Sequence, residues 1–181
     1  MEKPIEAQVG ELLRRHGLSL ALGESCTGGL LAHRLTNVPG SSDYFWGGVV
    51  AYSNRVKERV LGVRPETLRD EGAISRKTAL EMARGARNAL GADIGLAVTG
   101  IAGPGGALPG KPVGLTWVAL CEPKQEWARE FTWGGDRLLN KSQSAQAALQ
   151  ILLEYLEGLS TRGEEKESRP DSEPGGSGQG P

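Results

Sequence analysis

The sequence predicts an α/β protein with a three-layer α/β/α fold around a mixed, mostly parallel five-stranded sheet. Three observations predict it. Short apolar runs, typical of buried strands, alternate with segments whose apolar residues recur at helical spacing. The first three strands are linked through helices, which is the connection that parallel strands require. The last two strands are joined by the short turn 122–125 and therefore form an antiparallel hairpin.

The first third of the chain alternates helix and strand. Residues 4–16 place apolar side chains at helical spacing, and Gly17 can end that helix because glycine readily adopts the left-handed conformation. Residues 18–22 predict a short buried strand, and a helix is expected from Ser25. Residues 44–52 are apolar and β-branched enough for a second strand.

The middle of the chain continues the same alternation. Ser53 is expected to cap a short helix, and residues 64–68 to form a helical turn. Ser75 then caps a longer helix that Gly91 closes. Residues 93–99 are a short hydrophobic run of the kind that lies buried in parallel sheets, and they give the third strand.

The last third contains the hairpin and a final helix. Residues 113–121 and 126–133 predict the fourth and fifth strands, and Asp136 is expected to cap a helix with apolar residues at spacings of four and three. Residues 161–181 hold no aromatic or large aliphatic side chain and are rich in Gly, Pro and Glu. We therefore expect one folded domain over residues 1–160, followed by a disordered tail over 161–181.

The composition argues against several functional classes. The formal net charge of −1 provides no field that would steer a polyanion, so no nucleic-acid partner is expected. Cys26 and Cys121 form no C-x-x-C pair, which favours reduced thiols and no metal site. The amino terminus lacks an apolar signal core and no stretch is long enough to cross a bilayer. These features predict a cytoplasmic protein with no membrane partner.

The predicted topology brings four junctions to one edge of the sheet. Strands one to three end at that edge because they are parallel, and the hairpin returns the fifth strand to it. The four junctions are residues 25–29, 52–57, 99–106 and 134–137. Ligands of open α/β sheets bind at such an edge, so we expect the functional site there.

Two of these junctions supply a nucleophile and a base. Ser25 can attack a carbonyl if a base reaches it, and Lys57 can be that base if burial keeps its amine neutral near pH 7. Backbone N–H groups of the turn 26–29 would hold the oxyanion. Both residues also have ordinary interpretations, Ser25 as a helix cap and Lys57 as a solvated lysine. The two histidines lie away from the junctions, so a Ser–His–Asp arrangement is not expected.

The other two junctions suggest an anion site. Thr99, Gly100 and Gly103 begin a loop whose backbone could cradle a phosphate. Arg137 could clamp the same phosphate with two N–H groups, or it could pair with Asp136. The loop matches neither the P-loop nor the dinucleotide-binding pattern, so neither of those functions is expected.

Six short motifs identify a family when they are taken together. In order, they are Glu24-Ser-Cys-Thr-Gly-Gly29, Tyr52-Ser-Asn-Arg-Val-Lys57, Gly72-Ala-Ile-Ser75, Thr99-Gly-Ile-Ala-Gly-Pro104, Lys111-Pro-Val-Gly114 and Gly135-Asp-Arg137. From about residue 5 to about residue 157, the chain resembles the carboxyl-terminal domain of the competence-damage protein CinA. That family includes stand-alone nicotinamide mononucleotide deamidases (PncC).

The resemblance implies a function and a set of site residues. The activity would be hydrolysis of the carboxamide of nicotinamide mononucleotide to nicotinate mononucleotide and ammonia, without metal or cofactor, as part of pyridine nucleotide salvage in NAD metabolism. The catalytic residues would be Ser25 as nucleophile, Lys57 as general base, and Tyr52. The substrate-binding residues would be Thr27, Gly28, Gly29, Thr99, Gly100, Gly103 and Arg137. The protein would be a homo-oligomer, a dimer or larger.

Two alternatives stay open at this point. One is a catalytically silent module that binds a nucleotide or a protein partner and is linked to competence or to the DNA-damage response. The other is an amidohydrolase with the same Ser25–Lys57 pair that acts on a different amide.

Overall fold

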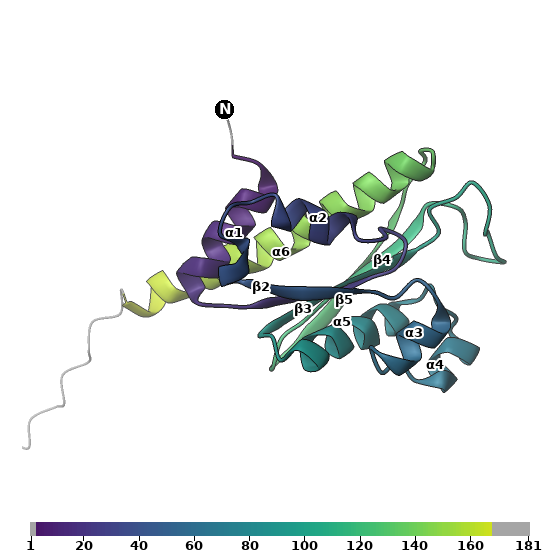
Figure 1. Cartoon of the computed structure of the whole chain (residues 1–181), viewed down its shortest axis with the longest axis horizontal. Coiled ribbons are helices and arrows are strands. Elements are labelled where there is room, and N and C mark those ends of the chain that lie inside the picture. The colour runs from purple at the N-terminus through teal and green to yellow at the C-terminus, as the bar shows by residue number, and fades with distance from the viewer. Residues whose placement is uncertain (1–2, 168–181) are drawn as a thin grey trace, which may run out of the picture.

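The computed structural model describes residues 3–167, and for 161–167 it describes the backbone only. It has three layers (Figure 1), with helices α1, α2 and α6 on one face of a central sheet and α3, α4 and α5 on the other. The strands are β1 (Leu20–Glu24), β2 (Phe45–Val50), β3 (Ile94–Gly100), β4 (Leu115–Cys121) and β5 (Glu126–Thr132). The helices are α1 (Ile5–His16), α2 (Leu30–Thr36), α3 (Asn54–Arg59), α4 (Pro65–Asp70), α5 (Arg76–Leu90) and α6 (Arg137–Glu167), with a 3-10 turn η1 at Ser41–Asp43.

The sheet confirms the predicted fold class. Its strand order is β2-β1-β3-β4-β5. β1 pairs in parallel with both β2 and β3, whereas β4 pairs antiparallel with both β3 and β5. Within the described residues, β4 is therefore the one strand that opposes the other four, and the carboxyl ends of those four strands lie at one edge.

Most of the helix caps lie where the sequence places them. Gly17 and Gly91 adopt the left-handed conformation at the ends of α1 and α5. The side chain of Ser53 accepts a hydrogen bond at the start of α3, and that of Ser75 does so at the start of α5. The Oδ1 atom of Asp136 accepts from the Leu139 N–H in the first turn of α6.

The helix expected from Ser25 is the main correction to the predicted elements. β1 runs on to Glu24, residues 25–29 form a separate turn, and α2 begins only at Leu30. Gly28 and Gly29 have φ angles of 62° and 95°, which an α-helix does not allow. The two glycines therefore extend the turn and delay the helix by several residues.

The last helix also passes the predicted domain boundary. α6 continues to Glu167, so the backbone of 161–167 is helical rather than disordered. Lys and Glu in this stretch have good helix propensity, and extending a helix that is already nucleated costs little. The rest of the predicted tail, 168–181, lies outside the described residues.

The two faces of the sheet carry different cores. Toward α1, α2 and α6 the central strands present large side chains such as Leu22 and Leu96. Toward α5 they present small ones such as Ala21 and Ala97. Close packing on the α5 side requires Gly95, because a Cβ there would lie 2.0 Å from the carbonyl oxygen of Ala83. In the part of the chain that the structure describes, no helix has both the length and the apolarity to span a bilayer.

Candidate active site

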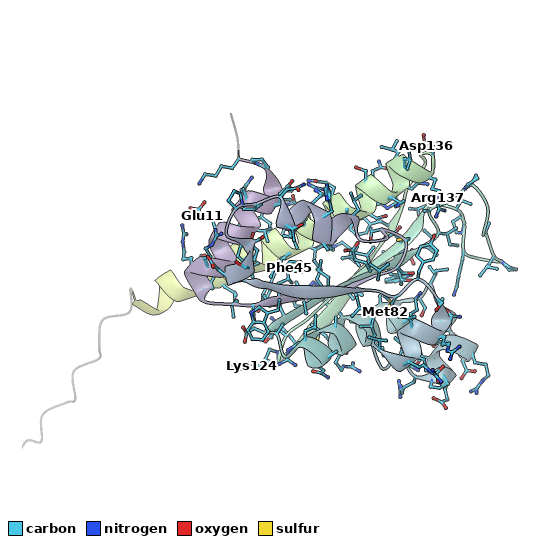
Figure 2. All side chains as sticks on the ribbon, in the orientation of Figure 1. Glu11, Phe45, Met82, Lys124, Asp136 and Arg137 are labelled. Atoms are coloured by element: carbon cyan, nitrogen blue, oxygen red, sulfur yellow. The ribbon has the colours of Figure 1, made fainter. Side chains whose placement is uncertain are left out.

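The four predicted junctions meet around a cavity of about 250 Å³ at the carboxyl edge of the sheet. Its lining residues come from the turn after β1, the start of α3, the segment before α5, the loop after β3 and the start of α6. They are Ser25, Cys26, Tyr52, Asn54, Lys57, Ala73, Ile74, the loop residues 99–103, 105 and 106, and Arg137. Figure 2 shows Arg137 beside Asp136 at the start of α6.

Ser25 and Lys57 lie side by side in this cavity. The Nζ atom of Lys57 lies 2.9 Å from the Oγ atom of Ser25 and donates to the carbonyl of Ala51 at 2.8 Å. The Ser25 N–H donates to the Val98 carbonyl at 2.9 Å, which ties the nucleophile to β3. The serine and the amine are therefore within proton-transfer distance.

The surroundings of Lys57 favour its neutral form. The residue is only 2% exposed, and no carboxylate pairs with it among the described residues. Burial lowers the pKa of the Lys57 amine, because a charged ammonium loses its hydration there. A lysine in this state can accept a proton from a hydroxyl, so the interpretation of Lys57 as a solvated helix residue is wrong.

The turn after Ser25 offers fewer free N–H groups than the sequence suggests. The Gly28 N–H donates to the Ser25 carbonyl, and the Gly29 N–H donates to the carboxylate of Glu24. Over residues 3–167, the N–H groups of Cys26 and Thr27 donate to no other residue. Of these two residues only Cys26 lines the cavity, so its amide is the one placed to meet an oxyanion.

Thr27, Gly28 and Gly29 lie outside the cavity lining, although a substrate-binding role was expected for them. Thr27 is fully buried, and its hydroxyl has no hydrogen-bond partner in the described part of the chain. The two glycines shape the turn through their positive φ angles. Gly28 and Gly29 therefore determine the path of the backbone and do not line the cavity.

Cys26 lines the cavity but is poorly suited to be a nucleophile. Its side chain is almost fully buried, and burial raises the pKa of its thiol to about 11. Thiolates are the reactive form of cysteine, so this thiol stays protonated near neutral pH. Ser25 is the better candidate for covalent chemistry.

Arg137 bridges two of the converging segments at the cavity mouth. It donates to the hydroxyl of Tyr52 through Nη2 and to the carbonyl of Gly103 through Nη1, each at 2.7 Å. It does not pair with Asp136, which caps α6 instead. A guanidinium carries five N–H donors, so Arg137 retains donors for an anionic ligand.

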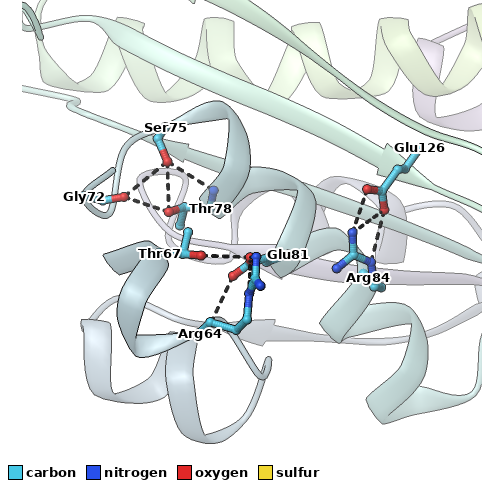
Figure 3. Close-up of polar contacts among 8 residues, drawn as sticks. All are labelled: Arg64, Thr67, Gly72, Ser75, Thr78, Glu81, Arg84 and Glu126. Carbon is cyan, nitrogen blue, oxygen red and sulfur yellow. Dashed lines mark hydrogen bonds and ion pairs between the residues drawn. The ribbon is translucent and has the colours of Figure 1, made fainter. Parts of the chain in front are cut away.

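Thr99 holds the cavity wall in place. Its hydroxyl donates to the carbonyl of Ala73 at 2.8 Å, so this proton is already used within the protein. Gly72, the residue before Ala73, is held in the same way. Figure 3 shows that the hydroxyls of Ser75 and Thr78 both donate to its carbonyl. The segment that these bonds fix contributes Ala73 and the apolar side chain of Ile74 to the cavity.

The positions of the strand ends do not predict this wall, because residues 72–75 do not follow a strand. The motif Gly72-Ala-Ile-Ser75 was the signal that could have revealed it. Gly100 and Gly103, in contrast, are needed for close packing: a Cβ at Gly100 would lie 2.6 Å from the Leu115 carbonyl, and one at Gly103 would lie 2.6 Å from the Val113 side chain.

Comparisons with known proteins show the family to which the chain belongs. The family model of the CinA C-terminal domain matches residues 2–156. The chain is 49% identical over 159 residues to a CinA-like protein of Chloroherpeton thalassium, covering 86% of this chain and 38% of that protein. A CinA-like protein of Salinibacter ruber is 49% identical over 146 residues, or 81% of this chain and 35% of the relative. The chain thus spans little more than a third of the length of these relatives.

Solved structures give the same result. The competence damage-inducible protein A of Klebsiella pneumoniae has a TM-score of 0.82 and 36% identity, with 84% of this chain and 94% of that chain covered. The competence/damage inducible protein CihA of Agrobacterium tumefaciens has a TM-score of 0.77 and 40% identity, with 87% and 99% covered. The chain belongs to the CinA C-terminal domain family.

Proposed function

We propose that this member of the CinA C-terminal domain family hydrolyses the carboxamide of nicotinamide mononucleotide to nicotinate mononucleotide and ammonia, a step of pyridine nucleotide salvage. The observation that carries the proposal is the 2.9 Å separation of Lys57 Nζ from Ser25 Oγ, with the amine buried and without a carboxylate partner within residues 3–167. A neutral lysine next to a serine at the floor of a cavity is suited to attack a carbonyl that carries a poor leaving group.

In the first half of the reaction, Ser25 Oγ attacks the carboxamide carbon while its proton passes to Lys57. The oxyanion that forms accepts a hydrogen bond from the N–H group of Cys26, which lines the cavity. The Lys57 ammonium then donates its proton to the amide nitrogen as the C–N bond breaks, so that ammonia leaves. An ester between Ser25 and the nicotinoyl group remains.

In the second half, water hydrolyses that ester. Lys57 takes a proton from the water as its oxygen attacks, the Cys26 amide again holds the oxyanion, and the proton returns to Ser25 Oγ as the ester bond breaks. One water is consumed and one ammonia is released per cycle, and the protein returns to its starting state. The Ala51 carbonyl orients the amine throughout, because it accepts a hydrogen bond from Nζ.

The substrate's phosphate would lie at the cavity mouth. Arg137 supplies the cation there, and Tyr52, which is 60% exposed, supplies a phenol held by that cation. The wall formed by Ala73 and Ile74 would contact the pyridine ring deeper in the cavity. In this arrangement Tyr52 acts in binding the nucleotide end of the substrate, and proton transfer is left to Lys57.

The test is ammonia release from nicotinamide mononucleotide by the purified protein with no metal added. Ser25→Ala and Lys57→Ala should each lower turnover by at least about 10³-fold, because each removes a partner of one catalytic unit. Lys77→Ala is the matched control, since Lys77 is an exposed lysine at the start of α5. A folded Ser25→Ala protein that still releases ammonia at the wild-type rate would refute the mechanism.

The names of the relatives favour a second candidate. They refer to competence and damage and describe no amidase, as in the Klebsiella pneumoniae protein. A silent module would bind nicotinamide mononucleotide, or another partner, without turnover. Calorimetry separates the two cases, because binding heat without ammonia release supports the module. If ammonia is released only from other carboxamides in a substrate panel, the amidase assignment stands and the substrate is a different amide.

A further inference from the structure

We infer that Glu24 is a positioning residue for the Ser25 nucleophile: its carboxylate clamps the turn 25–29 and so fixes where Ser25 Oγ and the Cys26 amide point. The inference rests on the proposed function only in taking Ser25 to be the nucleophile. Glu24 lies outside the cavity lining and does not touch the reacting atoms. It acts through the backbone of the turn that follows it.

Three hydrogen bonds form the clamp. The Oε2 atom of Glu24 accepts from the N–H groups of Gly29 and Leu31, at 3.0 Å and 3.1 Å, and its Oε1 atom accepts from the Ala32 N–H at 2.8 Å. The side chain is 1% exposed, and no lysine or arginine pairs with it in the described part of the chain. Backbone amides of α2 are thus the partners that offset the burial of this carboxylate.

The residue that precedes α2 explains why such a clamp is needed. The N-cap position is Gly29, which has no side chain and cannot satisfy the first free N–H groups of the helix. In α3 and α5 a local serine does this work. In α2 the acceptor is the carboxylate of Glu24, five residues before the N-cap Gly29. The hydrogen bonds that cap the helix therefore also connect the two ends of the turn that carries Ser25.

The other end of the clamp is anchored in the middle of the sheet. Glu24 is the last residue of β1, where it is paired with Val50 on one side and Val98 on the other. Its carbonyl accepts from the Ala51 N–H at 2.7 Å. Glu24 therefore holds both ends of the turn that contains Ser25, Cys26 and Thr27. Its backbone fixes the end at the sheet, and its carboxylate fixes the end at α2.

The chain provides a matched control for the loss of such a carboxylate. Glu81 is also buried, at 5% exposure, and it also accepts several hydrogen bonds, from the backbone and side chain of Arg64 and from the hydroxyl of Thr67 (Figure 3). These bonds join α4 to α5, away from the cavity lining. Glu24→Gln and Glu81→Gln should both lower stability, but only Glu24→Gln should impair the nucleophile.

The decisive measurement is the rate at which phenylmethanesulfonyl fluoride labels Ser25, followed by mass spectrometry of the folded protein. In this reaction Ser25 Oγ bonds to sulfur, the S–F bond breaks, fluoride leaves, and the serine proton passes through Lys57 to solvent. The rate should fall by about tenfold to a hundredfold in Glu24→Gln, since small misplacements of a nucleophile have effects of this size. Glu81→Gln should react like the wild type, and Ser25→Ala should not react at this site.

Hydrolysis of nicotinamide mononucleotide gives a second readout. Glu24→Gln should lower kcat and leave KM unchanged. Glu81→Gln, which is destabilised but has an intact turn, should change neither constant when the assay is run well below its melting temperature. If the wild type is sulfonylated but releases no ammonia, the proposed substrate is wrong and the sulfonylation rates alone decide the role of Glu24. If Ser25 of the wild type does not react with the probe, it is not an activated nucleophile, and the inference is overturned together with the mechanism.

Glu24→Asp keeps the experiment decisive if Glu24→Gln does not fold. Aspartate retains both acceptor oxygens on a side chain that is one methylene shorter, so it cannot hold the same three amides without moving the turn. Its sulfonylation rate should lie below that of the wild type. A folded Glu24→Gln or Glu24→Asp protein that reacts as fast as Glu81→Gln would overturn the inference.

Discussion

Replacing Lys57 with methionine tests the feature on which the proposed chemistry depends, a buried amine with a lowered pKa. Methionine has a similar length and no charge, so it can fill the same space with little repacking. The variant loses the hydrogen bonds of Nζ to Ser25 and to the Ala51 carbonyl. Leaving that carbonyl without its donor should cost about 1–3 kcal/mol of unfolding free energy at every pH.

The pH dependence of stability is the sharper part of this prediction. The pKa of Lys57 is lower in the folded protein than in the unfolded chain, so between the two values the unfolded chain binds more protons. Below the folded pKa, the wild type carries the full penalty for burying the amine. As pH rises through the folded pKa toward the ordinary lysine value, that penalty disappears. The wild type should therefore gain stability relative to Lys57→Met by about 1.4 kcal/mol for each unit by which burial lowers the pKa.

The assay is urea denaturation of both proteins at a series of pH values from neutral to alkaline, with unfolding free energies compared at each pH. Other groups titrate equally in both proteins, so the difference isolates Lys57. Lys77→Met, which replaces an exposed lysine at the start of α5, is the control for the loss of a lysine side chain. In parallel, kcat/KM of the wild type should rise with pH through a midpoint below the ordinary lysine pKa. A Lys57→Met difference that does not vary with pH, or that varies in the opposite direction, would refute a lowered lysine pKa.

Two further predictions concern neighbours of this pair. Thr99→Val should lower the unfolding free energy by about 1–3 kcal/mol and raise KM for nicotinamide mononucleotide, because the Ala73 carbonyl loses its donor and the cavity wall loosens. Thr99→Ser should behave like the wild type in the same assays, and equal behaviour of the valine and serine variants would contradict this role. Iodoacetamide should label Cys26 of the folded protein very slowly at pH 8, since a pKa of about 11 leaves roughly 10⁻³ of the thiol ionised. Mass spectrometry would follow the labelling, and a Cys26 as reactive as an ordinary free thiol would contradict a raised thiol pKa.

The sequence by itself determined the α/β class, the directions of the strands and the edge at which the site forms. These follow from local patterns: apolar runs mark strands, residues such as Ser53 and Ser75 mark helix starts, and connection length decides between parallel and antiparallel neighbours. The six motifs were also enough to identify the CinA family. Ser25 and Lys57 could be proposed as partners because both follow strands that end at the same edge.

Only the tertiary structure decided which groups are free to act. The carboxylate of Glu24 takes the Gly29 amide, one of those that the sequence had offered to an oxyanion, together with the amides of Leu31 and Ala32 in α2. Thr99 and Arg137 reach partners far along the chain, Ala73 and Tyr52, and no local pattern encodes such contacts. Whether a lysine is a base or a solvated cation depends on its distance from water and from other charges. Periodicity in a sequence predicts which face of a helix is buried, but three-dimensional packing sets that distance, and with it the chemistry of Lys57.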